Sequence, residues 1–106
     1  MDSGVLLKIN IMVDPWIEKA LRMQRETESF PDLIILKAAL WLEKKHVQAP
    51  HYDTATIVSL HYLILAFRKK VKGRAILREH YMSQALLWRR EAINQLDQAT
   101  SASMEA

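Results

Sequence analysis

The stretch that most constrains the fold is residues 57–67, which read I-V-S-L-H-Y-L-I-L-A-F. Ser59 and His61 are the two positions in this run that are neither apolar nor aromatic. A helix that is apolar on every side is typical of a segment buried all round. The run is also too short to span a bilayer, which takes about 20 residues. We therefore predict that it forms the central helix of one packed core.

Residues that favour tight turns are scarce in this chain. Its 106 residues include two glycines, three prolines and no cysteine. Sandwiches and barrels need many turns, and phosphate-binding loops need clustered glycines, so the composition argues against both. Without cysteine there is no disulfide, thiolate chemistry or cysteine-based zinc site. We predict one domain over residues 1–98 that needs no metal or cofactor, followed by a disordered tail at 99–106.

Apolar periodicity and end signals predict four helices. Pro15 after Asp14 suits the first position of a helix, and Ser29 with Asp32 forms a capping-box pattern. Gly73 stands where a helix-ending residue of left-handed conformation is expected. The predicted helices cover residues 15–26, 31–46, 53 or 54 to 71, and 74–97.

These helices predict an all-α fold, a four-helix orthogonal or bundle-like domain made of two helical hairpins. Ahead of them, every second residue of the segment 4–13 is apolar, which suits a short strand, although a packed extended arm or a helical turn fits nearly as well. We expect neither a membrane-spanning helix nor a signal peptide. The expected location is the cytoplasm.

The predicted helices carry more apolar surface than they can cover. The second and third are apolar nearly all round, whereas the first is short, about 18 Å at 1.5 Å per residue. Exposed apolar patches usually mark association surfaces. We therefore expect a non-enzymatic adaptor, chaperone or regulatory module that binds another protein, a second copy of itself, or both. The candidate protein-binding residues are Trp16, Ile34, Trp41, Tyr62 and Trp88.

A run of cations without acids at residues 68–78 offers an alternative partner, a nucleic acid. Lysine and arginine bind phosphates, but the net charge of the chain is only +3. No aromatic residues interleave with these cations to stack on bases. The same charges would also stabilise the end of the preceding helix through its dipole. The candidate anion-binding residues are Arg68, Lys69, Lys70, Lys72, Arg74 and Arg78.

Residues 5–46 bring an alternating segment, then Asp14 and Pro15 opening a helix, then a second helix ending in L-W-L-E-K-K. This order resembles the ribbon-helix-helix DNA-binding fold. The resemblance implies that two chains pair their strands and insert them into the major groove, with Lys8 and Asn10 facing bases. The sequence departs from that family by lacking a glycine between the helices and by a more apolar second helix.

Arg74 and His80 resemble the arginine–histidine pair of HEPN-type ribonucleases. The resemblance implies a histidine that acts as general base toward a ribose hydroxyl and an arginine that stabilises phosphate charge. Ala75 stands where that family has a polar residue. Because no paired carboxylates or Ser-His-Asp order accompany them, we predict that the chain is not an enzyme.

Overall fold

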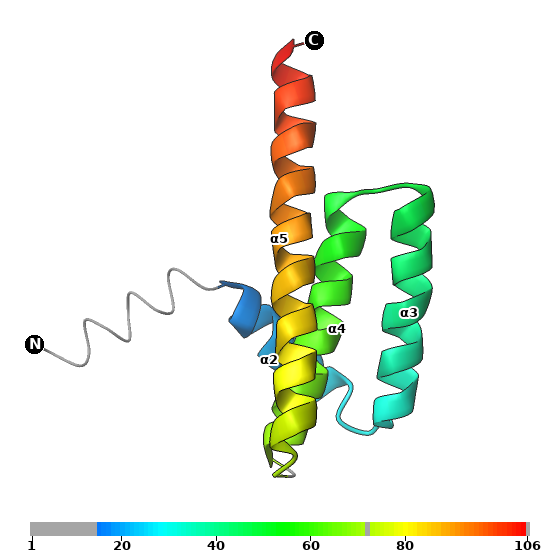
Figure 1. The fold of residues 1–106 in the computed structure, drawn as a ribbon, viewed down its shortest axis with the longest axis vertical. Coiled ribbons are helices and arrows are strands. Elements are labelled where there is room, and N and C mark those ends of the chain that lie inside the picture. The colour runs from blue at the N-terminus through cyan, green and yellow to red at the C-terminus, as the bar shows by residue number, and fades with distance from the viewer. Residues whose placement is uncertain (1–14, 72, 106) are drawn as a thin grey trace, which may run out of the picture.

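The computed structural model describes residues 15–71 and 73–105, the side chains of 70, 71 and 102–105 excepted. Over these ranges it contains four α-helices and no strand (Figure 1). They are α2 (Pro15–Glu26), α3 (Asp32–Gln48), α4 (Tyr52–Val71) and α5 (Ala75–Glu105). The prediction of an all-α, bundle-like domain of four helices is confirmed. The segment 4–13, predicted as a strand, an arm or a helical turn, lies outside the described residues.

Helix α4 lies at the centre of the fold. It packs closely against α2, α3 and α5, and no other pair of the described helices brings its backbones as close together. Its contact with α5 is the most extensive, and both α3 and α5 run antiparallel to it (Figure 1). Val58, Leu63, Ile64 and Leu65 are each at most 1% exposed. The prediction that residues 57–67 form a central buried helix is confirmed.

Ser59 is a fully buried polar residue inside this apolar helix. Its hydroxyl donates a hydrogen bond to the carbonyl oxygen of Ala85 at 2.6 Å, and it accepts one from Nε1 of Trp16 at 2.8 Å. Leaving such groups unpaired in a core would cost about 1–3 kcal/mol each. The Ser59 side chain therefore joins α2, α4 and α5, and its hydroxyl group is fully hydrogen-bonded.

The helix ends agree with the sequence in part. Gly73 has a φ of 71°, the left-handed conformation predicted after α4. At its other end α4 begins at Tyr52, because the ring nitrogen Nδ1 of His51 accepts a hydrogen bond from the backbone N–H of Asp53 at 3.2 Å. Helix α5 does not end near residue 97 but continues to Glu105, through most of the segment expected to be a tail.

The capping box predicted at the start of α3 is wrong. The helix begins at Asp32 with Pro31 as its N-cap, and no side chain caps it. The Asp32 carboxylate binds α4 instead, accepting from Arg68 Nη1 at 3.0 Å and from Lys69 Nζ at 2.8 Å. These charge-assisted hydrogen bonds are of the strong kind, so Asp32 serves to join the start of α3 to α4.

Candidate protein-binding surface

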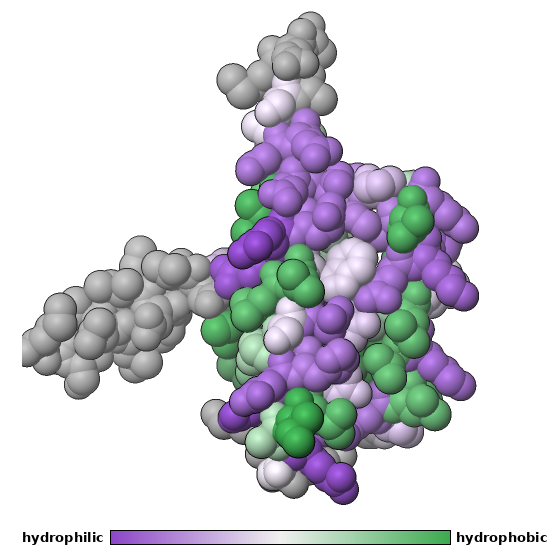
Figure 2. Space-filling model, in the orientation of Figure 1, coloured by the Kyte–Doolittle hydropathy of each residue, from purple (hydrophilic) through white to green (hydrophobic). Residues whose placement is uncertain are grey.

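The side of α3 that faces away from α4 is uncovered. Among the described helices, only α4 has its backbone close to that of α3. The inward residues Ile35 and Ala39 are buried, and the buried His46 also contacts α5, where its ring centroid lies 5.3 Å from that of Trp88. In Figure 2 the apolar surface of α3 lies on the right of the molecule, where no other helix crosses it. Five large apolar side chains of α3 are 46–77% exposed, namely Leu33, Ile34, Leu40, Trp41 and Val47.

These five side chains form two rows along the helix. One row is Leu33, Leu40 and Val47, and the other is Ile34 and Trp41. Residues seven apart drift only about 20° around a straight helix, so each row runs nearly parallel to the axis. At about 100° per residue, the exposed side chains of Lys37 and Lys44 project between the two rows. We call these five apolar residues and two lysines the outer face of α3.

The outer face carries positive charge and no acid. Every residue of α3 is described, and both of its acids point elsewhere. Asp32 is paired with two cations of α4, and Glu43 accepts a hydrogen bond from a tyrosine hydroxyl of α4 at 2.8 Å. Beside the face, the Lys45 ammonium lies 4.5 Å from the centroid of the Trp41 ring, within the range of a cation–π contact.

The structure separates the five predicted protein-binding residues. Ile34 and Trp41 lie on the outer face of α3. Trp16 and Trp88 are partly buried against the core, and Tyr62 is 5% exposed. All five belong to apolar stripes of the sequence. Such a stripe does not show whether a neighbouring helix covers it in the folded chain. In the folded chain only Ile34 and Trp41 offer a partner a large exposed area.

Sequence reasoning missed five residues of this surface, the apolar Leu33, Leu40 and Val47 and the two lysines, Lys37 and Lys44. Their seven-residue spacing was a usable signal, because it keeps side chains on one side of a helix. One expectation also needs correction. Residues 57–67 were expected to share in the uncovered apolar surface, but α4 is enclosed by three helices and most of this run is buried. Of the two helices α3 and α4, it is therefore α3 that keeps most of the surplus apolar surface.

Tyr62 connects the inner side of α3 to α4. Its hydroxyl donates to Oε1 of Glu43 at 2.8 Å, and its ring stacks on that of Tyr81 with centroids 6.3 Å apart. Burial of the phenol raises the pKa of Tyr62 above its ordinary value of 10.0, and the hydrogen bond to Glu43 and the nearby charges of Glu43 and Tyr81 raise it further. The folded state therefore holds this proton more tightly than the unfolded state.

We expect the free energy of unfolding to fall as the pH rises above about 10, where the unfolded chain releases this proton and the folded chain keeps it. Below that pH both states are protonated and the contribution is complete. One proton gives a slope of at most about 1.4 kcal/mol per pH unit. Urea unfolding between pH 8 and 11 should show a shallower decline for Tyr62→Phe than for the wild type. Equal slopes would contradict this account.

The basic segment does not form one free surface. Arg68 donates to the carbonyl oxygens of Phe30, at 2.6 Å, and of Thr27 as well as to the Asp32 carboxylate, and its side chain is 11% exposed. Together with Lys69, which pairs with the same carboxylate, it ties the connection between α2 and α3 to α4. Of the other predicted anion-binding residues, Arg74 is exposed and Arg78 half-buried. The Lys70 side chain and Lys72 lie outside the described residues.

The two resemblances gain no support from geometry. Lys8 and Asn10, expected to read bases, lie outside the described residues, and α2 and α3 pack on α4 rather than on each other. Arg74 and His80 are both exposed, and the His80 ring neighbours Tyr81, with centroids 5.5 Å apart. In the described part of the chain, no three histidine or carboxylate side chains gather as a metal site requires.

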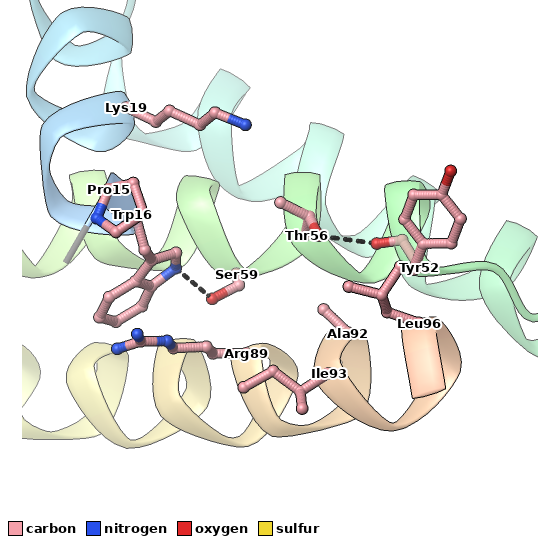
Figure 3. A pocket seen from close by; sticks show the side chains of 10 residues that line it. All are labelled: Pro15, Trp16, Lys19, Tyr52, Thr56, Ser59, Arg89, Ala92, Ile93 and Leu96. Carbon is pink, nitrogen blue, oxygen red and sulfur yellow. Dashed lines mark hydrogen bonds between the residues drawn. The ribbon is translucent and has the colours of Figure 1, made fainter. Parts of the chain in front are cut away.

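A pocket of about 190 Å³ lies between α2, α4 and α5 (Figure 3). Helices α2 and α5 both pack closely on α4, whereas their backbones do not approach each other, so a space remains between them that side chains only partly fill. Trp16 and Ser59 are already joined by their hydrogen bond, and the Arg89 guanidinium lies 4.6 Å from the centroid of the Trp16 ring. The lining residues are Pro15, Trp16, Lys19, Tyr52, Thr56, Ser59, Arg89, Ala92, Ile93 and Leu96. The pocket is thus smaller than the roughly 300–1,000 Å³ of ordinary ligand sites.

Comparisons of the chain with protein-family models, with curated proteins and with solved structures find no match. Over residues 15–71 and 73–105, no helix combines the length and the apolarity that crossing a membrane requires. The outer face of α3, with five exposed large apolar side chains, is the most distinctive surface of the described chain.

Proposed function

We propose that this protein is a non-enzymatic interaction module, an adaptor, chaperone or regulatory protein of the cytoplasm, that binds another protein through the outer face of α3. The observation that carries the proposal is the set of five large apolar side chains uncovered on one side of one helix. Removing apolar surface from water contributes about 25 cal/mol per Å². Trp41 supplies an aromatic anchor of the kind that dominates interface energies.

Helix α5 also exposes apolar side chains, and these support the proposal less well. Leu86 and Ile93 are about half exposed, but the exposed residues around them include Arg90, Asn94 and Asp97. Polar residues of both charge signs therefore interrupt the apolar surface of α5. On α3, by contrast, two unbroken apolar rows are separated by lysines alone.

Photo-crosslinking tests the proposal face by face. A benzophenone amino acid replaces Leu40 in the centre of the outer face, in cells that naturally make this protein, and a matched chain carries it at Arg90 on α5. We expect a discrete adduct with another protein from position 40 and none from position 90, because only the first would lie in the interface. Adding Trp41→Ser to the chain labelled at position 40 should remove the adduct.

The same experiment separates the alternatives. An adduct of twice the mass of the chain would identify a second copy as the partner. Nucleic-acid binding through the basic segment predicts that Arg74→Glu with Arg78→Glu abolishes function and that affinity falls steeply with salt, whereas the adduct at position 40 should survive both changes. Equal adducts from positions 40 and 90, or none from either, would overturn the proposed function.

A further inference from the structure

Resting on that proposed function, we infer that the partner of the outer face is an acidic amphipathic helix of another protein rather than a second copy of this chain. The inference comes from the position of Lys37 and Lys44. Both project between the two apolar rows, so a partner that covers both rows also covers these two ammonium groups.

Covering the lysines requires carboxylates on the partner. An ammonium group removed from water without a partner is strongly unfavourable, and breaking one side of a buried ion pair costs about 3–5 kcal/mol. Within α3 no acid is available, because Asp32 and Glu43 are turned inward and already bonded. The carboxylates that pair with Lys37 and Lys44 must therefore come from the binding partner.

The spacing of the outer face fits a helix. The row from Leu33 to Val47 extends about 21 Å at 1.5 Å per residue, about four turns. A seven-residue repeat is the spacing that a second helix follows when it packs at a small crossing angle. Lys37 and Lys44 are likewise seven residues apart, so two acids seven apart on the partner helix reach both lysines in one register.

A second copy of this chain does not meet these requirements. A symmetric dimer through the outer face brings the same patch from each copy together. The lysines of one copy would then lie between the apolar rows of the other, close to its lysines. Such like-charge contacts are unfavourable by several kcal/mol across an interface, so the face selects against its own copy and in favour of an acidic partner.

Three labelled helical peptides, each about three heptads long, test the inference against the full chain by fluorescence anisotropy. They share the same apolar residues and differ at two positions seven apart in the middle of the apolar face, which hold Glu, Gln or Lys. We expect the Glu peptide to bind at least about tenfold more tightly than the Gln peptide and the Lys peptide to bind weakest. Because both lysines are exposed, Lys37→Glu with Lys44→Glu should keep the fold and reverse the order.

The outcomes separate the inference from the proposed function. If all three peptides bind equally, or if charge reversal leaves their order unchanged, the acidic partner is wrong, while adducts at position 40 would still support an interaction module. If none binds, or if Trp41→Ser leaves binding of the Glu peptide unchanged, the outer face is not its docking surface and the inference fails. Light scattering that shows a concentration-dependent dimer, lost on Trp41→Ser, would instead identify a second copy.

Discussion

Replacing Leu63 by alanine is expected to lower the free energy of unfolding by about 2–5 kcal/mol, the range measured for buried leucines in other cores. Leu63 is 1% exposed and belongs to the cluster formed where α2, α3 and α5 meet α4. Truncation removes apolar contacts and leaves a cavity that the enclosing helices can only partly fill. Urea unfolding followed by circular dichroism measures the loss.

Leu40→Ala is the matched control, because it makes the same chemical change on the outer face of α3. Leu40 is 46% exposed, so we expect its free energy of unfolding to change by no more than about 0.5 kcal/mol. The pair thus separates a leucine that holds the fold from one available for binding. A loss at position 40 as large as that at position 63 would show that α3 is enclosed, and the proposed surface would not exist.

Replacing Arg68 by methionine is expected to lower the free energy of unfolding by about 2–3 kcal/mol. The substitution keeps much of the aliphatic stem but removes three hydrogen bonds, to the Thr27 and Phe30 carbonyl oxygens and to Asp32. Hydrogen bonds to charged groups contribute about 1.5–3 kcal/mol each. The total effect should be below their sum because Lys69 still neutralises Asp32.

Arg74→Met provides the control, since Arg74 is exposed and should tolerate the change within about 0.5 kcal/mol. Much of the Arg68 loss should persist in high salt, because salt screens a pair at the protein surface far more than one that is mostly buried. Equal losses at positions 68 and 74 would show that the hydrogen bonds from Arg68 to the α2–α3 connection do not contribute to the free energy of unfolding.

Much of the fold could be predicted from local patterns. The four helices, the buried run at 57–67 and the left-handed Gly73 depend on periodicity and on end signals within a few residues. The prediction at Ser29 and Asp32 failed because α3 begins with Pro31 as its N-cap, and the Asp32 carboxylate pairs with two cations of α4 that are distant in sequence. The expected end of α5 near residue 97 failed because apolar periodicity stops there, whereas the helix itself continues to Glu105.

The candidate surface could be predicted only in part. Ile34 and Trp41 could be identified as apolar residues of a predicted helix that is apolar on several sides. Trp16, Tyr62 and Trp88 also lie on apolar stripes of predicted helices, so the sequence does not distinguish them from the first two. Contact with neighbouring helices distinguishes the exposed pair from the other three residues. The sequence of one helix does not show such contacts. The basic segment could likewise be predicted only in part. Arg68 and Arg74 belong to the same run of cations in the sequence, but in the structure Arg68 is nearly buried and Arg74 is exposed.

The amino-acid sequence by itself determined four helices and placed the most apolar of them in the core, because both follow from short-range patterns of apolar residues. Only the tertiary structure decided which helix keeps an uncovered side. Three helices share the surface of α4, so α4 is enclosed, whereas among the described helices only α4 packs its backbone closely against α3. Its opposite side, with two apolar rows and two lysines between them, stays open because no further helix of the described chain reaches it.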